Sequence, residues 1–311
     1  MSRPLAPVPE FLEPPEPGSD AQARPRKVKR VRKRHGPSHY ILPAWTGLVI
    51  LWTIVPILVM VVYSFNKAPN QRETFHWYGF TTYWYQHVFQ IPDLTQALVN
   101  SLLVASASTT IATLIGVPMA MALARHRFLG RSAVDATVFV DIAAPSVVVG
   151  ASLLALFLTL NVNRGLITII IAHVAFNVAF VIIVVRARIV GLDRSIERAA
   201  ADLGAGPWTT FQKVLFPLIL PGILAGAMLC FAMSIDDFII TEFVAGQTLT
   251  FPLWVYGSVK VGIPPQVFVM GTMIFVFGIA LALVNTYVAR RTAKAEAASM
   301  RIAAAAAAAE A

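Results

Sequence analysis

The sequence has little charge and almost no cysteine, and both shortages exclude whole classes of protein. Asp, Glu, Lys and Arg make up 13 % of its 311 residues, whereas soluble domains carry roughly 25 %. The one cysteine, Cys230, lies in an apolar run. The chain can therefore form no intrachain disulfide and no cysteine-based metal cluster, and we expect Cys230 to be a small buried apolar residue. A glycine-rich phosphate loop, an HExxH zinc motif and a nucleophile elbow are also missing. We expect no catalytic residue, no metal site and no ATP hydrolysis by this chain itself.

Apolar residues, by contrast, are abundant. They make up 57 % of the chain, and the mean hydropathy is +0.68. A helix needs about 20 predominantly apolar residues to cross a bilayer. Six segments reach that length: 41–65, 97–124, 134–160, 166–185, 214–235 and 267–289. The sequence therefore predicts an all-α membrane protein with six transmembrane helices in a lipid bilayer.

Positive charge is distributed unevenly between the two sides of these segments. If six spans cross the membrane, 21 of the 25 Lys and Arg residues lie on the same side of it as the N-terminus. The other four are Lys67, Arg72, Arg164 and Lys260. Because positive charge gathers on the cytoplasmic side, both termini are predicted to lie inside. Residues 1–40, rich in proline and then basic, are interpreted as a disordered cytoplasmic tail rather than a nucleic-acid-binding patch, since the first span follows directly. Residues 41–290 form the membrane domain, and 291–311 an alanine-rich cytoplasmic tail.

The longest polar interval between two apolar segments runs from residue 191 to 222 and faces the cytoplasm in this orientation. Its local chemistry predicts two short helices joined by a hinge. Asp193 is a candidate N-cap, and Gly204 suits the left-handed position that ends many helices. Gly206 and Pro207 then restart a helix, with proline in its first turn. From these features alone, an ordinary surface loop is the alternative.

The order of residues in this interval resembles the signature loop of the permease subunits of ABC importers. That pattern is Glu-Ala-Ala, three residues, Gly, nine residues, Ile, one residue, Leu-Pro; Val214 and Phe216 stand here for its Ile and Leu. One position departs, because the Glu of the pattern aligns with Arg198 while Glu197 lies one residue earlier. The resemblance implies that residues 191–213 form a coupling loop that docks on a separate ATPase subunit. The residues assigned to coupling are Glu197, Arg198, Ala199, Ala200, Asp202, Gly204, Pro207 and Pro217.

Two adjacent aspartates, Asp236 and Asp237, stand at the end of the fifth apolar segment. Acidic side chains at such places are costly and are functional candidates by default. Two neighbouring carboxylates at a helix C-terminus repel each other and oppose the helix dipole, and a bound cation would relieve both costs. Alternatively, the helix has already ended and one aspartate caps the next short helix. The residues alone leave both interpretations open.

The run SIDDFIITEFVAG, followed by FPLWVYGSVKVGIPPQ, resembles the end of the fifth span in the spermidine/putrescine type of permease. Ser234, Asp236 and Asp237 match its serine and two aspartates, which implies a role in polyamine passage. A dication suits paired carboxylates because charge-assisted hydrogen bonds are stronger than neutral ones. We add Glu242, which lies further along the same run, to this candidate translocation site.

A second departure concerns the third apolar segment. Ser146 follows Pro145 where that subgroup carries an acidic residue, and Asp141, one helical turn earlier, is the candidate substitute. The alternative is that Asp141 is a hydrogen-bonded structural aspartate at the subunit interface. His173, Asn177 and Asn285 are single polar groups within spans, for which interhelical hydrogen bonds are expected.

The resemblance covers about residues 75–290 and implies the type I permease fold of ABC importers in a bacterial cytoplasmic (inner) membrane. It implies several partners besides the bilayer: a cytoplasmic ATPase dimer that binds the ATP, a second and non-identical permease, and a periplasmic or surface solute-binding protein; no nucleic acid and no cofactor of its own are expected. The function expected is ATP-driven import of a polyamine or similar organic cation. The alternatives are a permease for another small solute, amino-acid-like or other, and a secondary transporter, which would require inverted repeats that the sequence does not show.

Overall fold

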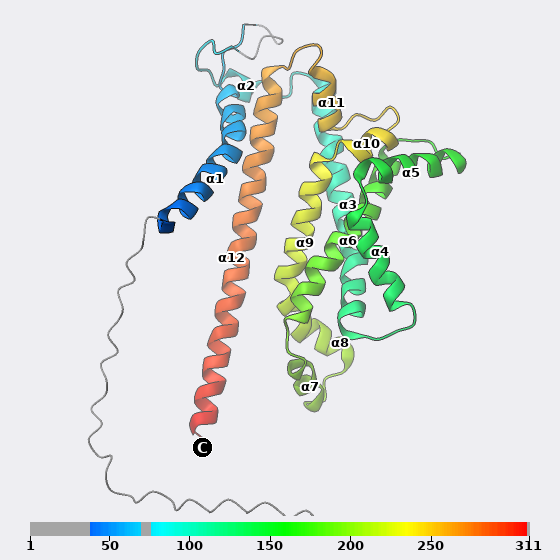
Figure 1. The fold of residues 1–311 in the computed structure, drawn as a ribbon, viewed down its shortest axis with the longest axis vertical. Coiled ribbons are helices and arrows are strands. Elements are labelled where there is room, and N and C mark those ends of the chain that lie inside the picture. Colours follow the sequence, from blue (N-terminus) through cyan, green and yellow to red (C-terminus); the bar gives the residue numbers. More distant parts are fainter. Residues whose placement is uncertain (1–37, 70–75, 310–311) are drawn as a thin grey trace, which may run out of the picture. The chain divides into compact units, whose positions relative to one another are not determined.

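The computed structural model describes residues 38–69 and 76–309, and within these ranges the chain is helical apart from short connections and one β-bridge, between Asn66 and Phe80 (Figure 1). Residues through Thr53 and residues from Ile54 onward form two separate units, and the second holds the buried core and all the candidate site residues. Five helical stretches are long and apolar enough to cross a membrane. They are α1 (Ser38–Tyr63), α3 (Pro92–Arg125), α6 (Leu166–Val190), the rod that ends in α9 (Phe216–Asp236), and α12 (Pro265–Ala309).

The third expected span is not a continuous helix, and in this respect the sequence-based expectation for 134–160 is wrong. Two helices, α4 (Arg131–Ala143) and α5 (Ser146–Thr159), meet at an angle of 110°. Pro145 lacks an N–H and forces the residue before it out of the helical region, so Ala144 adopts φ −70° and ψ 131°. Counted as one broken span, the pair brings the number of spans to six.

The core of the bundle is built by α3, α6 and α9, which pack along one another. The buried face of α3 consists mostly of small residues at helical spacing: Ala97, Ser101, Ala105, Ser108, Ala112, Gly116 and Ala120. Small residues let the backbones of membrane helices approach closely. At Gly116, an added Cβ would lie 2.7 Å from Cγ1 of Val181 on α6. Cys230 on α9 is fully buried, as expected.

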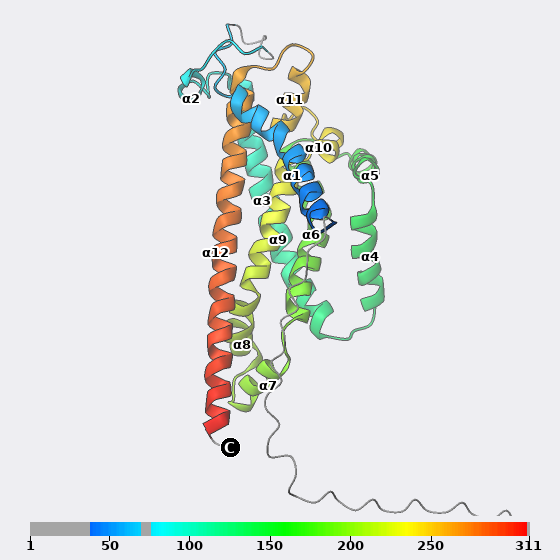
Figure 2. The same cartoon turned by 60° about the vertical axis from the view of Figure 1, so that its left-hand side comes forward.

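The short helices gather at the two ends of this bundle (Figures 1 and 2). At one end lie α7 (Ser195–Asp202) and α8 (Pro207–Thr210), which continues through one π-helical turn, η1 (Phe211–Leu215), into α9. At the other end lie α2 (Tyr83–Gln86), α10 (Ile239–Val244) and α11 (Phe251–Ser258). Residues 191–213 and the two aspartates therefore occupy opposite ends of the same rod.

The two tails expected from the sequence are covered only in part. Residues 1–37 of the expected N-terminal tail lie outside the described residues. At the other terminus, the last candidate span ends at Val288 while α12 continues as helix through Ala309.

Candidate functional site

The end of α9 separates the two aspartates. Asp236 is the last residue of the helix, and Asp237 follows in extended backbone. Oδ2 of Asp237 accepts two hydrogen bonds from Thr241, one from its backbone N–H and one from its hydroxyl, both at 2.8 Å. Asp237 thereby caps the first turn of α10, which is the structural role that the sequence left open for one of the pair.

A buried chain of polar side chains runs inward from Asp237 across α10, α6, α9 and α3. His173 on α6 is its centre: Nε2 lies 2.9 Å from Oγ1 of Thr241 and 3.4 Å from Oδ2 of Asp237, and Nδ1 lies 2.6 Å from Oγ of Ser234. Ser234 in turn bonds to Ser108 at 3.0 Å. The interhelical bonding expected of His173 is confirmed. Since polar groups inside a membrane must find partners within the protein, the chain fixes how these helices meet at the acidic end of α9.

Sequence reasoning missed two members of this chain, Ser108 and Thr241. Both are hydroxyl residues that are fully buried. Nothing in their neighbourhood along the sequence marks Ser108 as a partner of Ser234 or Thr241 as a partner of His173, since each pair is more than 60 positions apart. Interhelical hydrogen bonds were also expected for Asn177 and Asn285, and for their side-chain carbonyl oxygens this expectation fails. The buried Oδ1 atoms of Asn177 and Asn285 accept no hydrogen bond from the described part of the chain.

Asp236, in contrast to Asp237, is exposed and lines a cavity of about 470 Å³. The other lining residues are mostly apolar and aromatic: Ile235, Phe238, Phe251, Pro252, Val255, Tyr256, Val259, Gly271 and Ile274. The rings of Phe238 and Tyr256 lie with their centroids 4.6 Å apart. Aromatic faces attract cations, and the apolar wall suits methylene groups. The cavity therefore combines one carboxylate with the surroundings that an aliphatic amine requires.

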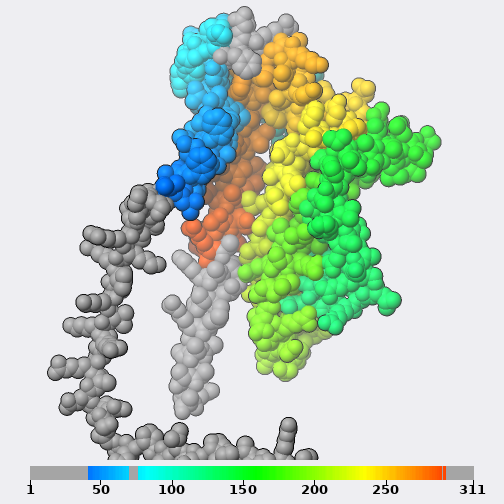
Figure 3. Space-filling model, viewed as in Figure 1, coloured from blue at the N-terminus to red at the C-terminus, as the bar shows by residue number. Residues whose placement is uncertain are grey.

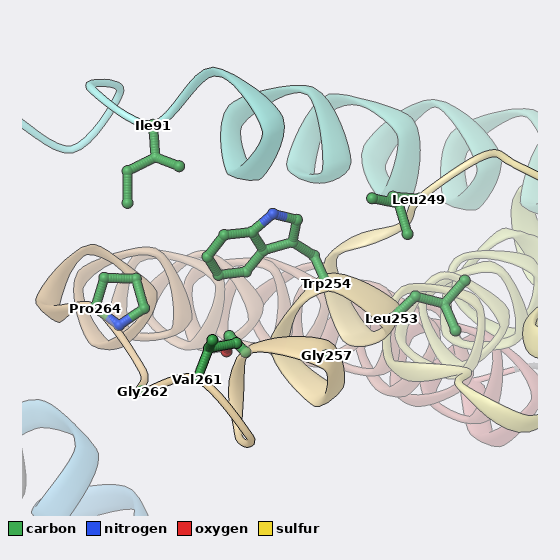
Figure 4. A pocket seen from close by; sticks show the side chains of 9 residues that line it. Ile91, Leu249, Leu253, Trp254, Gly257, Val261, Gly262 and Pro264 are labelled. Atoms are coloured by element: carbon green, nitrogen blue, oxygen red, sulfur yellow. The ribbon is translucent and has the colours of Figure 1, made fainter. Parts of the chain in front are cut away.

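A second cavity, of about 500 Å³, lies at the same end of the bundle, between the start of α3 on one side and α11 with the segment that follows it on the other (Figure 4). The indole of Trp254 lies across it, with Ile91 on one side and Val261 and Pro264 on the other (Figure 4). Its lining contains no acidic side chain. Of these two cavities, the one at Asp236 is therefore the one that offers a cation a counter-charge.

The remaining candidates of the translocation site lie elsewhere. Asp141 is half-buried on α4, one turn before the bend at Pro145, and Glu242 is exposed on α10. Neither lines the cavity of Asp236. Within the described ranges the carboxylate of Asp141 makes no hydrogen bond or ion pair. Its assignment, to the translocation path or to a hydrogen bond at the subunit interface, stays a prediction.

At the opposite end, the hinge predicted within residues 191–213 has the expected geometry. Gly204 has φ +81°, its N–H donates to the carbonyl of Ala201 at 2.9 Å, and the N–H of Ala205 donates to that of Ala200 at 3.0 Å. These two bonds form a Schellman motif, which ends α7 with a left-handed glycine. The prediction for Gly204 is confirmed, as is the restart at Pro207, the first residue of α8.

The start of α7 differs from the prediction by one residue. The helix begins at Ser195 after Arg194, and Asp193 caps it from one position further out, its carboxylate accepting the Ser195 N–H at 2.9 Å. The hydrogen bonds from the Ser195 backbone and side chain hold the pKa of Asp193 below its usual value. Because these bonds favour the charged carboxylate, the cap is strongest when Asp193 is ionised.

The two faces of α7 differ in chemistry. Ile196, Ala199 and Leu203 form an exposed apolar stripe at helical spacing, and the side chain of Leu203 is 89 % exposed. We call these three residues the apolar stripe. Trp208 on α8 is 67 % exposed, and in the space-filling view this part of the chain projects from the end of the bundle (Figure 3). Arg198 and Asp202 are also exposed, whereas Glu197 and Ala200 turn inward and are half-buried.

A bundle of apolar helices with an amphipathic loop at one end and an acidic, aromatic cavity at the other has the organisation of the membrane-embedded subunit of a transporter. Residues 112–294 match the family described as the binding-protein-dependent transport system inner membrane component, and the chain belongs to this family. It is an inner-membrane permease and a non-enzymatic transport subunit.

Curated relatives and solved structures agree with this assignment. The chain is 34 % identical over 253 residues to the spermidine/putrescine transport system permease protein PotC of Haemophilus influenzae, covering 81 % of this chain and 97 % of that protein. It is 35 % identical over 242 residues to the putrescine transport system permease protein PotI of Escherichia coli K12, covering 74 % and 85 %. Its fold resembles that of a chain in a bacterial ABC transporter that imports the acidic polysaccharide alginate, with a TM-score of 0.57, 19 % identity and coverage of 83 % and 98 %. The fold is that of ABC importer permeases.

Proposed function

We propose that this permease serves an ATP-driven importer of putrescine, spermidine or a similar organic cation. The observation that carries the proposal is the exposed carboxylate of Asp236 at an aromatic cavity large enough for an alkyl chain. The polyamine substrates named for PotC and PotI support the same class of solute. One ammonium group of the substrate bonds to Asp236, and the methylene chain packs against Phe238 and Tyr256.

Asp237 contributes charge rather than a free coordination site. Its Oδ2 is engaged by Thr241 and faces His173, so its position is fixed while its charge adds to the negative potential beside Asp236. A passing dication is attracted to the pair but bonds directly to one carboxylate, which favours release onward through the membrane. Ser234 holds the same arrangement from within the bundle. Asp141 and Glu242 act, in this proposal, at other points of the path.

The coupling loop and the orientation complete the proposal. Both termini and residues 191–213 lie in the cytoplasm, where the apolar stripe of α7 docks on an ATPase dimer; an apolar helical face laid on a partner is a common mode of recognition. Residues 41–290 form the permease domain and pair with a second permease. A solute-binding protein delivers the substrate outside, and closure of the ATPase dimer opens the path outward.

Uptake by the assembled transporter tests this proposal. The chain is co-expressed with its ATPase and second permease and reconstituted in proteoliposomes with ATP or ADP inside, and labelled putrescine is supplied with the solute-binding protein outside. We expect accumulation with ATP only, with unlabelled spermidine competing and unlabelled amino acids without effect. Competition by an amino acid but not by spermidine would assign another solute. Accumulation with ADP and an ion gradient would indicate a secondary transporter.

A further inference from the structure

The coupling loop is attached to the end of α3 by an ion pair. Arg125, the last residue of α3, has a side chain that is only 10 % exposed. Its Nη2 atom lies 2.8 Å from Oε1 of Glu197 and donates to the carbonyl of Leu192 at 3.2 Å. One guanidinium thus binds both Leu192, in the segment that leads into α7, and Glu197, in the first turn of α7.

A second arginine makes the attachment reciprocal. Nη2 of Arg194, the residue before α7, lies within hydrogen-bonding distance of the carbonyls of Ala124 and Arg125, at 3.4 and 3.3 Å. The last carbonyls of a helix have no partner within the helix, and a cation there also complements the helix dipole. Arg194 therefore caps α3 from the loop while Arg125 holds the loop from α3.

The ion pair depends on both of its charges. The Oε1 atom of Glu197 is shielded from solvent and accepts no hydrogen bond within the described residues, so the cation of Arg125 is what offsets the removal of this carboxylate oxygen from water. The Glu197 side chain is 31 % exposed and that of Arg125 only 10 %, so losing Glu197 leaves the more buried charge without compensation. The pair is thus specific for a carboxylate at position 197.

Helical geometry explains why the acidic residue stands at 197. Consecutive residues of a helix point about 100° apart, and on α7 the half-buried side is that of Glu197 and Ala200 while Arg198 points outward. A carboxylate at 198 would turn away from Arg125. With the acid at 197, the apolar stripe lies about 100–160° around the helix from Glu197 and stays exposed.

We propose that Arg125 and Glu197 are positioning residues: their ion pair straps α7 to the end of α3, so that a movement of α7 is transmitted to α3 and from there to α6 and α9, on which α3 packs. The strap also keeps the apolar stripe turned outward. This inference rests on the proposed role of residues 191–213 as the coupling loop, and it deepens that role by assigning the mechanical connection between loop and bundle.

A double-mutant cycle in the reconstituted transporter tests the strap. Glu197→Gln removes one charge at similar volume, and Arg125→Gln removes the guanidinium. Each is expected to lower the number of substrate molecules imported per ATP by about tenfold, since the charge left without its partner weakens the attachment. The half-saturation concentration for substrate should not change. The double variant should be no worse than either single one, because the second substitution removes a charge that has already lost its partner. Arg125→Lys, which keeps the charge, should recover most of the loss.

Arg127→Gln is the matched control, since Arg127 is exposed, lies two residues away and makes no ion pair within the described residues. The strap would be overturned if Glu197→Gln imported as many substrate molecules per ATP as the wild type. It would also be overturned if the losses of the two single variants multiplied in the double variant. Amide hydrogen exchange of residues 195–203 in the purified permease provides a readout that needs no substrate. Exchange should accelerate in Arg125→Gln and Glu197→Gln and stay unchanged in Arg127→Gln, and equal exchange in all three would refute the strap. If the wild-type complex imports no polyamine yet shows this exchange pattern, the substrate assignment fails and the strap stands.

Discussion

His173 and Asp237 lie in contact at the acidic end of α9, with Nε2 of the imidazole 3.4 Å from Oδ2 of the carboxylate. The same imidazole bonds to Ser234 through its other nitrogen. One side chain thereby ties α6 to both sides of the point where α9 ends and α10 begins. The position of the two aspartates is therefore set from inside the bundle as well as by the backbone that carries them.

Removing His173 should loosen this end of the molecule. In His173→Ala, Ser234 and Thr241 each lose a buried hydrogen-bond partner, and a lost bond of this kind costs about 1–3 kcal/mol. We expect the midpoint of thermal unfolding of the detergent-purified permease to fall. The control is His126→Ala at an exposed histidine, which should unfold like the wild type. Equal midpoints for the two variants would show that the buried chain contributes nothing to stability.

Gly204 should be sensitive to substitution for a reason that Gly206 does not share. An added Cβ meets no atom of the described residues within 4 Å at either position, but of the two only Gly204 has a positive φ. A β-carbon in the left-handed region costs roughly 1–2 kcal/mol, so Gly204→Ala should unsettle the end of α7, reduce uptake and weaken co-purification of the ATPase. Insertion into the membrane should be unaffected. Gly206→Ala should behave like the wild type, and similar losses in both variants would exclude backbone geometry as the cause.

The orientation can be checked by labelling from outside the cell. Cysteines placed at Ser132, at the start of α4, and at Gln247, in the exposed connection after α10, lie on opposite sides of the membrane in the proposed topology. In a Cys230→Ala background, an impermeant thiol reagent should label the cysteine at 247 in intact cells and the cysteine at 132 only after lysis. The reverse pattern would invert the topology.

How much can be predicted from the sequence depends on how local each feature is. The left-handed Gly204 and the restart at Pro207 depend on a few neighbouring residues, and the sequence predicts both correctly. Pro145 is equally visible, but whether such a proline bends a span slightly or breaks it by 110° depends on how α4 and α5 pack against the helices around them. The chain centred on His173 and the pair of Arg125 with Glu197 join residues more than 60 positions apart. Such contacts arise only when the helices pack, and no local pattern announces them.

The affinity for putrescine in the Asp236→Asn variant tests the central claim most directly. Asparagine keeps the volume of the side chain and removes the charge at the cavity. Losing one charge-assisted hydrogen bond costs about 1.5–3 kcal/mol, or about 10- to 100-fold in affinity. The half-saturation concentration for ATP-driven putrescine uptake should rise by this factor while the unfolding midpoint stays unchanged, whereas Asp237→Ala, which removes the acceptor that caps α10, should alter both. Asp236→Glu should transport better than Asp236→Asn. A wild-type half-saturation concentration in Asp236→Asn would contradict the assignment of this carboxylate to a cationic substrate.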